Sequence, residues 1–270
     1  MSYLVFIVAV VLLALLGAGG PLHRDAWLEA LDRRIDAIEL GNAPALLLRI
    51  AAPLLMAGIV LAITQIFLGD FAHALIGVAL LYFSWGRGDY PTELQRFLAR
   101  ARVGDTTGAG ELLGLENNEP GISDTWRREA LAHFAYRGYA RWFPSVLYFF
   151  LLGPFAAAAY RLVQLANTRS GGRFQEVQTA LDWLPSRLVL LTFAVLGDFD
   201  STRRLLTENA LKGDGSVGEL LAQGVERAWH LDESDLSGSE QTVAAVEAAG
   251  KATERSCAVW IILISLLALL

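Results

Sequence analysis

Two arginines beside long apolar runs are the residues best suited to bind a charged ligand. Arg161 lies near the end of the run FFLLGPFAAAAYRL, and Arg187 lies in the downstream segment LDWLPSRL. An arginine at the edge of bilayer-length apolar sequence is costly unless it reaches the headgroups or meets a partner. A guanidinium binds phosphate or carboxylate through two parallel hydrogen bonds, so the pair suggests an anion site. The alternative is that Asp182 neutralises Arg187 and that this pair is structural.

Further candidates flank other apolar segments. The turn Gly86-Arg87-Gly88-Asp89-Tyr90 directly follows one, and its amides with Arg87 suit a phosphate. The alternative is a helix C-cap with an anchoring arginine. Arg137 and Arg141 share one face of an expected helix because they are four residues apart; they are either an anion clamp or a basic belt at a helix end. The full set of candidate ligand-binding residues is Arg87, Asp89, Arg137, Arg141, Tyr160, Arg161, Asp182 and Arg187.

Several other chemistries lack their residue patterns in this sequence. The four histidines have no HxxxH or HExxH spacing, and Cys257 is the single cysteine, so we predict no metal site. No complete phosphate-loop or dinucleotide glycine pattern occurs, and no serine elbow or Cys/His dyad stands out. We therefore predict no cofactor and assign no catalytic residue. The net charge of −6 argues against a nucleic-acid partner.

The elements that position these residues are predicted to lie in a membrane. The chain is 54% hydrophobic and 19% charged, whereas soluble domains are closer to half apolar and a quarter charged. The first apolar segment has no positive region before it, which favours a retained helix over a signal peptide. Residues 188–199 are short for a crossing helix, so we expect a re-entrant or interfacial segment there. The apolar segments are residues 2–19, 46–68, 71–86, 143–165, 188–199 and 256–270.

The distribution of basic residues predicts the orientation. Arginines gather in residues 21–45 and 87–142, whereas the turn Leu68-Gly69-Asp70 has none. The positive-inside bias therefore places both arginine-bearing stretches in the cytoplasm, together with residues 200–255 if residues 188–199 cross. Apolar spacing predicts an amphipathic helix over Trp27–Leu40. The predicted fold is an all-α polytopic integral membrane protein, one membrane domain over residues 1–270 with a cytoplasmic helical cap.

The order of these motifs resembles the AmpE branch of the CobD/CbiB-like membrane family of cobalamin biosynthesis. One part of the resemblance is the amphipathic segment WLEALDRR after the first apolar run. A second is the apolar hairpin that leads into Asp89-Tyr90. The most specific part is GPFAAAAYR followed by LDWLPSRL. The likeness covers nearly the whole chain, and each motif is short.

The resemblance implies a multi-pass protein of the bacterial inner membrane. The AmpE branch is associated with cell-wall recycling and β-lactamase induction, beside a cytoplasmic amidase. The biosynthetic branch joins an aminopropanol unit to a corrinoid carboxyl group, and its YR motif is followed by an Asn-Thr-x-Asp type of segment. In this chain Asn167-Thr168-Arg169-Ser170 has no acidic residue, which favours the regulatory branch.

Three functions therefore stay open at this point. The first is a regulatory or sensor protein of the AmpE type that binds an anionic small molecule and a cytoplasmic amidase or another cell-wall recycling protein. The second is a membrane enzyme of adenosylcobinamide-phosphate synthesis. The third is a non-catalytic scaffold that docks partners through the cytoplasmic residues 87–141. In each case the lipid bilayer is a partner. A short C-terminal helix at Val259–Leu270 would also suit a homo-oligomer held together by helix packing.

Overall fold

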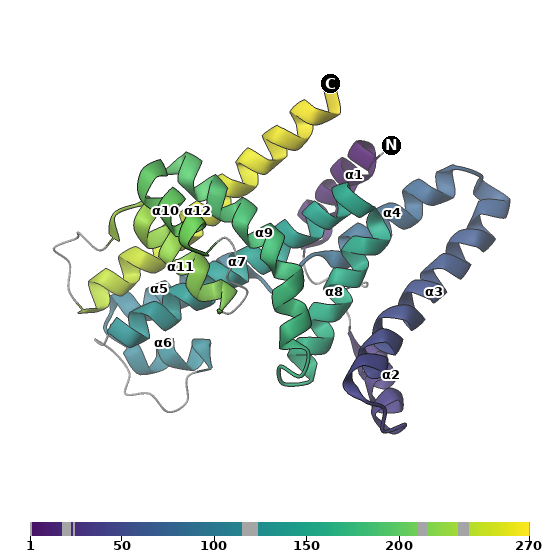
Figure 1. Cartoon of the computed structure of the whole chain (residues 1–270), viewed down its shortest axis with the longest axis horizontal. Coiled ribbons are helices and arrows are strands. Elements are labelled where there is room, and N and C mark those ends of the chain that lie inside the picture. The colour runs from purple at the N-terminus through teal and green to yellow at the C-terminus, as the bar shows by residue number, and fades with distance from the viewer. Residues whose placement is uncertain are drawn as a thin grey trace. The chain divides into compact units, whose positions relative to one another are not determined.

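The described part of the chain is entirely helical. The computed structural model describes residues 2–17, 23, 25–114, 124–209, 215–231 and 238–269. These residues form twelve α-helices and no strand (Figure 1), which confirms the all-α prediction. Within the single domain expected from the sequence, the chain divides into two compact units. The first unit is Met1–Gly88 with Arg141–Leu181, and the second is Asp89–Ala140 with Asp182–Leu270.

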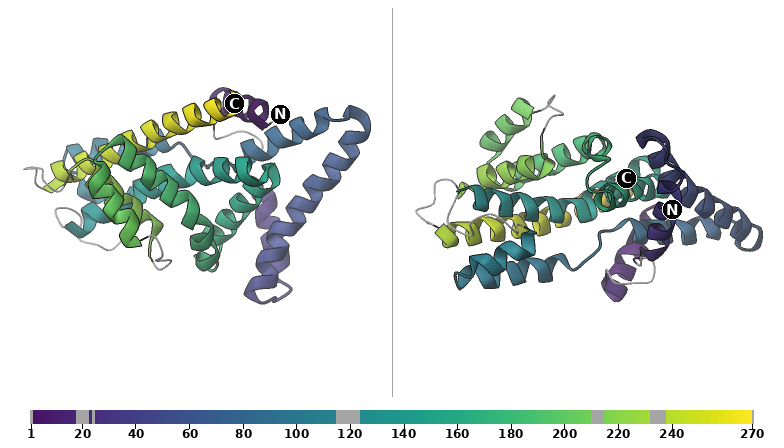
Figure 2. Two further views of the ribbon diagram at one scale, coloured as in Figure 1. Left: turned by 45° about the horizontal axis from the view of Figure 1, so that its top comes forward. Right: turned by 90° about the horizontal axis from the view of Figure 1, so that it is seen from below.

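The first unit is built around a helical hairpin. Its complete helices are α1 (Ser2–Leu16), α2 (Ala26–Asp36), α3 (Asn42–Leu68), α4 (Phe71–Ser84) and α8 (Pro154–Arg169). The chain reverses between α3 and α4 at Gly69, whose φ of 55° is accessible to glycine, and both views in Figure 2 show the resulting hairpin. Helix α4 packs against α1, α3 and α8, while α2 packs against α3.

A small apolar core holds this unit together. Leu28 of α2 packs with Phe83 of α4 and with Leu162 of α8 in one buried cluster. The amphipathic helix expected at Trp27–Leu40 is present as α2, but it ends at Asp36, and only part of its apolar face is directed to the core. Leu28 and Ile35 are its buried residues.

The second unit has a conventional aromatic core. Its complete helices are α5 (Tyr90–Arg102), α6 (Thr106–Leu113), α10 (Phe199–Asn209), α11 (Val217–Ala228) and α12 (Gly238–Leu269). Phe97, Trp126 and Phe134 are buried together in its core. Asp89 caps α5 by accepting a hydrogen bond from the Thr92 amide, and Pro91 lies in the first turn, a combination that favours the start of a helix.

Two long helices contribute to both units. They are α7 (Asp124–Leu152) and α9 (Gln175–Leu196). Helix α7 begins at Asp124. The predicted apolar segment 143–165 does not form one helix, because Gly153 has a φ of 92° and Pro154 begins α8.

Helix α9 differs from the expectation for residues 188–199. These residues are not a separate short segment, because one helix runs from Gln175 to Leu196 and has Pro185 in its interior. A proline removes one helical hydrogen bond and can bend a helix, yet α9 continues through Pro185. Likewise, residues 256–269 continue the long helix α12.

Two of the helices are long and apolar enough to cross a membrane, judged by length and composition within the described residues. They are α3 and α9, while α1 and α4 are shorter apolar helices. The two long helices differ in burial. Only 11% of the most apolar stretch of α3 is buried inside the protein, compared with 44% for α9.

Some sequence expectations fall outside the described residues. The predicted segments 2–19, 21–45, 87–142, 200–255 and 256–270 each include such positions. The described portions of these segments are helical or short connections between helices.

Candidate functional site

Five charged side chains of the first unit form a cluster, in which two arginines share the carboxylate of Asp32. Arg49 of α3 donates through Nε to Asp32 Oδ1 over 2.8 Å, and Arg169 of α8 donates through Nε to Asp32 Oδ2 over 2.7 Å. Arg49 also donates through Nη2 to Asp36 Oδ1 over 2.6 Å. Arg173 completes the group, with its Nη1 at 4.0 Å from the same Asp36 oxygen. We call these five residues the Asp32 cluster.

The Asp32 cluster is buried at one edge and open at the other. The side chain of Arg49 is 5% exposed and that of Asp32 16%, whereas Asp36 is 55% and Arg173 37% exposed. A charge as buried as Arg49 is maintained only when it is paired and hydrogen-bonded. Its two carboxylate partners provide that pairing.

The turn between α8 and α9 positions the arginines. Asn167 accepts a hydrogen bond from the Phe174 amide at 3.0 Å and donates to the Gln175 side chain at 2.9 Å. This places the Phe174 ring against the guanidinium groups of Arg49 and Arg173, at 5.6 and 5.8 Å from the ring centroid. Asn167 therefore orders the turn that carries Arg169 and Arg173.

Arg87 lies at the end of α4 and has several protein partners. It donates to both carboxylate oxygens of Asp25, over 2.9 and 3.2 Å, and to the carbonyls of Phe83 and Trp85. These contacts cap the last turn of α4 and tie it to the start of α2. Of the two readings of this turn, the contacts of Arg87 match the anchoring one.

Arg137 and Arg141 have separate local partners. In the second unit Arg137 forms an ion pair with Glu93 of α5 at 2.6 Å, and both side chains are more than a third exposed. In the first unit Arg141 donates to the Gly88 carbonyl at 2.7 Å. Each of these two arginines therefore contacts a residue of its own unit.

Tyr160 and Arg161 are buried in the first unit. The Tyr160 hydroxyl accepts a hydrogen bond from Gln178 at 3.1 Å, and its ring stacks on Tyr148 at 5.5 Å. Arg161 is 5% exposed and donates to Gln164 one turn later. Arg161 belongs to the first unit and Arg187 to the second, so each is described within its own unit.

Asp182 is a buried carboxylate between two tyrosines of the second unit. It is 1% exposed. Its Oδ1 accepts from the Tyr139 hydroxyl at 3.0 Å, and its Oδ2 accepts from the Tyr136 hydroxyl at 3.2 Å. Two hydroxyl donors stabilise the charged form of a buried carboxylate. The sequence had singled out Asp182, but it gave no reason to pair it with tyrosines of α7.

Arg187 is held by backbone groups and by its own neighbour. Its guanidinium donates to the Asn209 carbonyl at 3.1 Å and to the Ser186 hydroxyl at 3.1 Å. It also lies over the Trp183 ring, 5.2 Å from the centroid. Because α9 is continuous, Arg187 is a helix residue and does not flank a loop.

Tyr90 and His133 of the second unit, both outside the predicted apolar segments, have pKa values that differ from the ordinary ones. Burial raises the pKa of the Tyr90 hydroxyl to about 12. Burial, and then the nearby charge of Arg137, lowers the pKa of His133, which outweighs the opposing effect of Glu93. Tyr90 is therefore protonated and His133 neutral at pH 7, so neither adds a charge to this unit.

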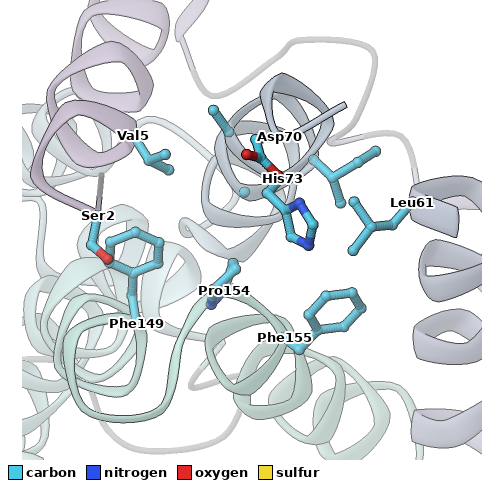
Figure 3. Close-up of a pocket in the computed structure, with 11 residues that line it drawn as sticks. Ser2, Val5, Leu61, Asp70, His73, Phe149, Pro154 and Phe155 are labelled. Atoms are coloured by element: carbon cyan, nitrogen blue, oxygen red, sulfur yellow. The ribbon is translucent and has the colours of Figure 1, made fainter. Parts of the chain in front are cut away.

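A cavity of about 570 Å³ lies beside the turn of the α3–α4 hairpin. Figure 3 shows the His73 ring directed into it, with Leu61 and Phe155 nearby and Asp70 at its edge. A second cavity of about 280 Å³ borders Trp27 and Phe83 and has apolar walls throughout. Both cavities are lined mainly by apolar side chains.

The Asp32 cluster is not predicted from the sequence, although the sequence contains one signal for it. Arg49 falls inside the predicted apolar segment 46–68, and an ionisable residue in such a segment is a functional candidate by default. Asp32, Asp36, Arg169 and Arg173 carry no comparable signal in the sequence. Among the described residues, no group of three His, Cys, Asp or Glu side chains is arranged to hold a metal ion.

Comparison of the chain with protein-family models, with curated proteins and with solved structures finds no match.

Proposed function

We propose that the chain is a multi-pass protein of the bacterial inner membrane that acts as a regulatory or sensor protein of the AmpE type. The observation that carries the membrane part is the surface of α3. Its large apolar side chains face away from the protein; Ile66 and Phe67, for example, are 79% and 80% exposed. Water is an unfavourable surrounding for such a surface, because each large apolar side chain gains roughly 1.5–3 kcal/mol when it leaves water.

The dimensions of α3 support the same proposal. Ile50–Leu68 carries no charged residue and is about 28 Å long as a helix, close to the roughly 30 Å of the bilayer hydrocarbon core. Arg49 immediately precedes this stretch and belongs to the Asp32 cluster. The charged cluster therefore marks one border of the apolar stretch, and the turn at Gly69-Asp70 marks the other.

The regulatory part of the proposal rests on the ordered motifs of the sequence. GPFAAAAYR and LDWLPSRL both lie in helices, α8 and α9, and their charged residues make buried contacts to protein groups. Such contacts suit a helical body that responds to a ligand or to a partner such as a cytoplasmic amidase. The acid of the biosynthetic Asn-Thr-x-Asp segment is replaced here by Ser170, which disfavours the synthase alternative.

Cell fractionation tests the membrane part. We expect the full-length protein to stay in the membrane pellet after alkaline carbonate washing and to be released only by detergent. Recovery in the aqueous fraction would contradict the proposal, because the apolar face of α3 would then have to be covered by protein.

A complementation assay tests the regulatory part. In a host that lacks its own copy, the wild-type chain should change the β-lactamase level induced by a β-lactam, and Asp182→Asn should weaken that effect at equal protein abundance. Unchanged induction, together with corrinoid-dependent turnover by the purified protein, would favour the synthase. Unchanged induction without turnover would favour the scaffold.

A further inference from the structure

We propose that the Asp32 cluster is a binding site for a phosphate group, supplied either by the headgroup of an anionic lipid or by a soluble phosphate compound. None of the five residues belongs to the candidate ligand-binding set predicted from the sequence. The inference depends on the proposed membrane location only for the lipid source, since a soluble phosphate needs no bilayer.

The first argument is the charge of the cluster. Three arginines, Arg49, Arg169 and Arg173, face two carboxylates, Asp32 and Asp36. With three arginines and two carboxylates, the formal charge of the cluster is one positive.

The second argument is unused hydrogen-bonding capacity inside the cluster. Nη1 of Arg49 and Nη1 of Arg169 are buried and have no hydrogen-bond acceptor among the described residues. Arg49 is 95% buried, since its side chain is 5% exposed. Buried donors without an acceptor are costly. Both arginines bind Asp32 through Nε, so the unused Nη1 groups of the cluster are available to a further oxyanion.

The third argument is the beginning of α3. Asn42 is the first residue of this helix, and its preceding residue, Gly41, gives no side-chain cap. The amides at the start of a helix attract anions. Arg173 donates through Nε to the Asn42 side chain at 2.6 Å, which brings a guanidinium to this helix start.

The arrangement also provides a route of entry. Asp36 and Arg173 form the exposed edge of the cluster, and their 4.0 Å separation is the longest ion-pair distance in it. A phosphate approaching there meets Arg173 and the α3 amides first, and then the deeper groups of Arg49 and Arg169. A guanidinium pairs with a phosphate in the same bidentate way as with a carboxylate.

The experiment compares two variants of equal charge in the full-length protein. Arg173→Gln changes the exposed edge of the cluster, so it should not prevent folding. Arg34→Gln is the control. Arg34 is exposed on α2, the helix that carries Asp32 and Asp36, and it forms no ion pair among the described residues. Each protein is reconstituted in phosphatidylcholine nanodiscs and titrated with inorganic phosphate at constant ionic strength, with thermal unfolding as the readout.

A second arm uses nanodiscs that contain phosphatidylglycerol and measures the lipid retained by the protein by native mass spectrometry. We expect Arg173→Gln to weaken binding about tenfold, the loss expected for one charge-assisted hydrogen bond. Arg34→Gln should change it by no more than about twofold, as for an exposed charge. Binding in the phosphate arm alone identifies a soluble ligand, and binding in the lipid arm alone identifies a headgroup.

The inference is overturned if neither arm shows saturable binding, or if both variants weaken binding equally. If the protein proves soluble without detergent, the proposed membrane location fails, but the phosphate titration in buffer still tests the site. If the protein binds phosphate but does not change β-lactamase induction, the binding site is supported and the proposed function is contradicted.

Discussion

At the scale of single residues, the molecule depends on carboxylates that serve more than one partner. Asp32 accepts from Arg49 and Arg169, which come from helices far apart in the sequence. Asp182 accepts from Tyr136 and Tyr139 in the same manner. Asp32 thereby connects α2 to α3 and α8, and Asp182 connects α9 to α7, so removal of either carboxylate should cost more than the loss of one exposed ion pair.

Asp32→Asn tests this expectation. The amide retains a carbonyl oxygen that can accept from one guanidinium but removes the charge that neutralises two. Breaking a buried ion pair at one partner leaves the other charge uncompensated, so we expect a loss of about 3 kcal/mol in the free energy of unfolding. Thermal unfolding of the purified protein in detergent measures the effect as a lowered melting temperature.

Two substitutions on the same helix calibrate that measurement. Asp36→Asn alters a carboxylate that is 55% exposed, and we expect a loss of about 1 kcal/mol or less. Glu29→Gln changes an exposed residue and should stay within about 0.5 kcal/mol of the wild type. Equal melting temperatures for Asp32→Asn and Glu29→Gln would show that Asp32 does not hold the cluster together.

At the scale of helices, a close backbone approach joins α4 to α7 in the first unit. The Gly86 amide donates to the Arg141 carbonyl at 2.9 Å. A side chain at this glycine would place its Cβ 2.8 Å from the Arg141 Cα, closer than carbon atoms approach without movement of the backbone. Only glycine therefore permits this contact.

Gly86→Ala should accordingly destabilise the protein by about 3 kcal/mol, the upper range for overpacking a well-fitted site. Gly58→Ala is the matched control in α3, because a Cβ there meets no atom within 4 Å. Alanine is preferred over glycine inside a helix by up to about 1 kcal/mol, so this variant should be slightly stabilised. Melting temperatures of the two variants that shift in the same direction would contradict the argument.

The helices could largely be predicted from the sequence, because their signals are local. The amphipathic spacing after Trp27 depends on neighbouring residues, and the helix is present. Helix α9 differs from the expected short segment at residues 188–199, because the helix begins at Gln175 and continues through Pro185. Tertiary packing of its flanking turns decides that such a proline stays inside a helix.

The charged cluster could not be predicted from local sequence. Asp32 and Arg169 are 137 residues apart in the chain and meet only because α2 and α8 both pack around α3. By contrast, Arg161 attracted attention by its apolar surroundings, and its described contact is to Gln164 within its own helix. The apolar context of an arginine indicates burial, whereas the identity of its partner depends on the fold.

At the scale of the whole molecule, the basic residues predict a direction for the α3–α4 hairpin. Arg33, Arg34 and Arg49 lie near the start of α3, while the turn at Gly69-Asp70 has no basic residue. The positive-inside bias places the start of α3 in the cytoplasm and Asp70 outside. Helix α3 is about 40 Å long, enough to separate the two positions by a bilayer.

Cysteine labelling in intact cells tests this direction. In a Cys257→Ser background, which removes the single cysteine, Asp70→Cys should react with a membrane-impermeant maleimide added outside. Arg34→Cys should react only after the inner membrane is opened, since the reagent cannot cross the hydrocarbon core. Both positions are exposed in the structure, so a missing reaction reflects the membrane and not burial. Labelling of both positions from the same side would mean that α3 does not cross, and its apolar surface would then require a protein partner.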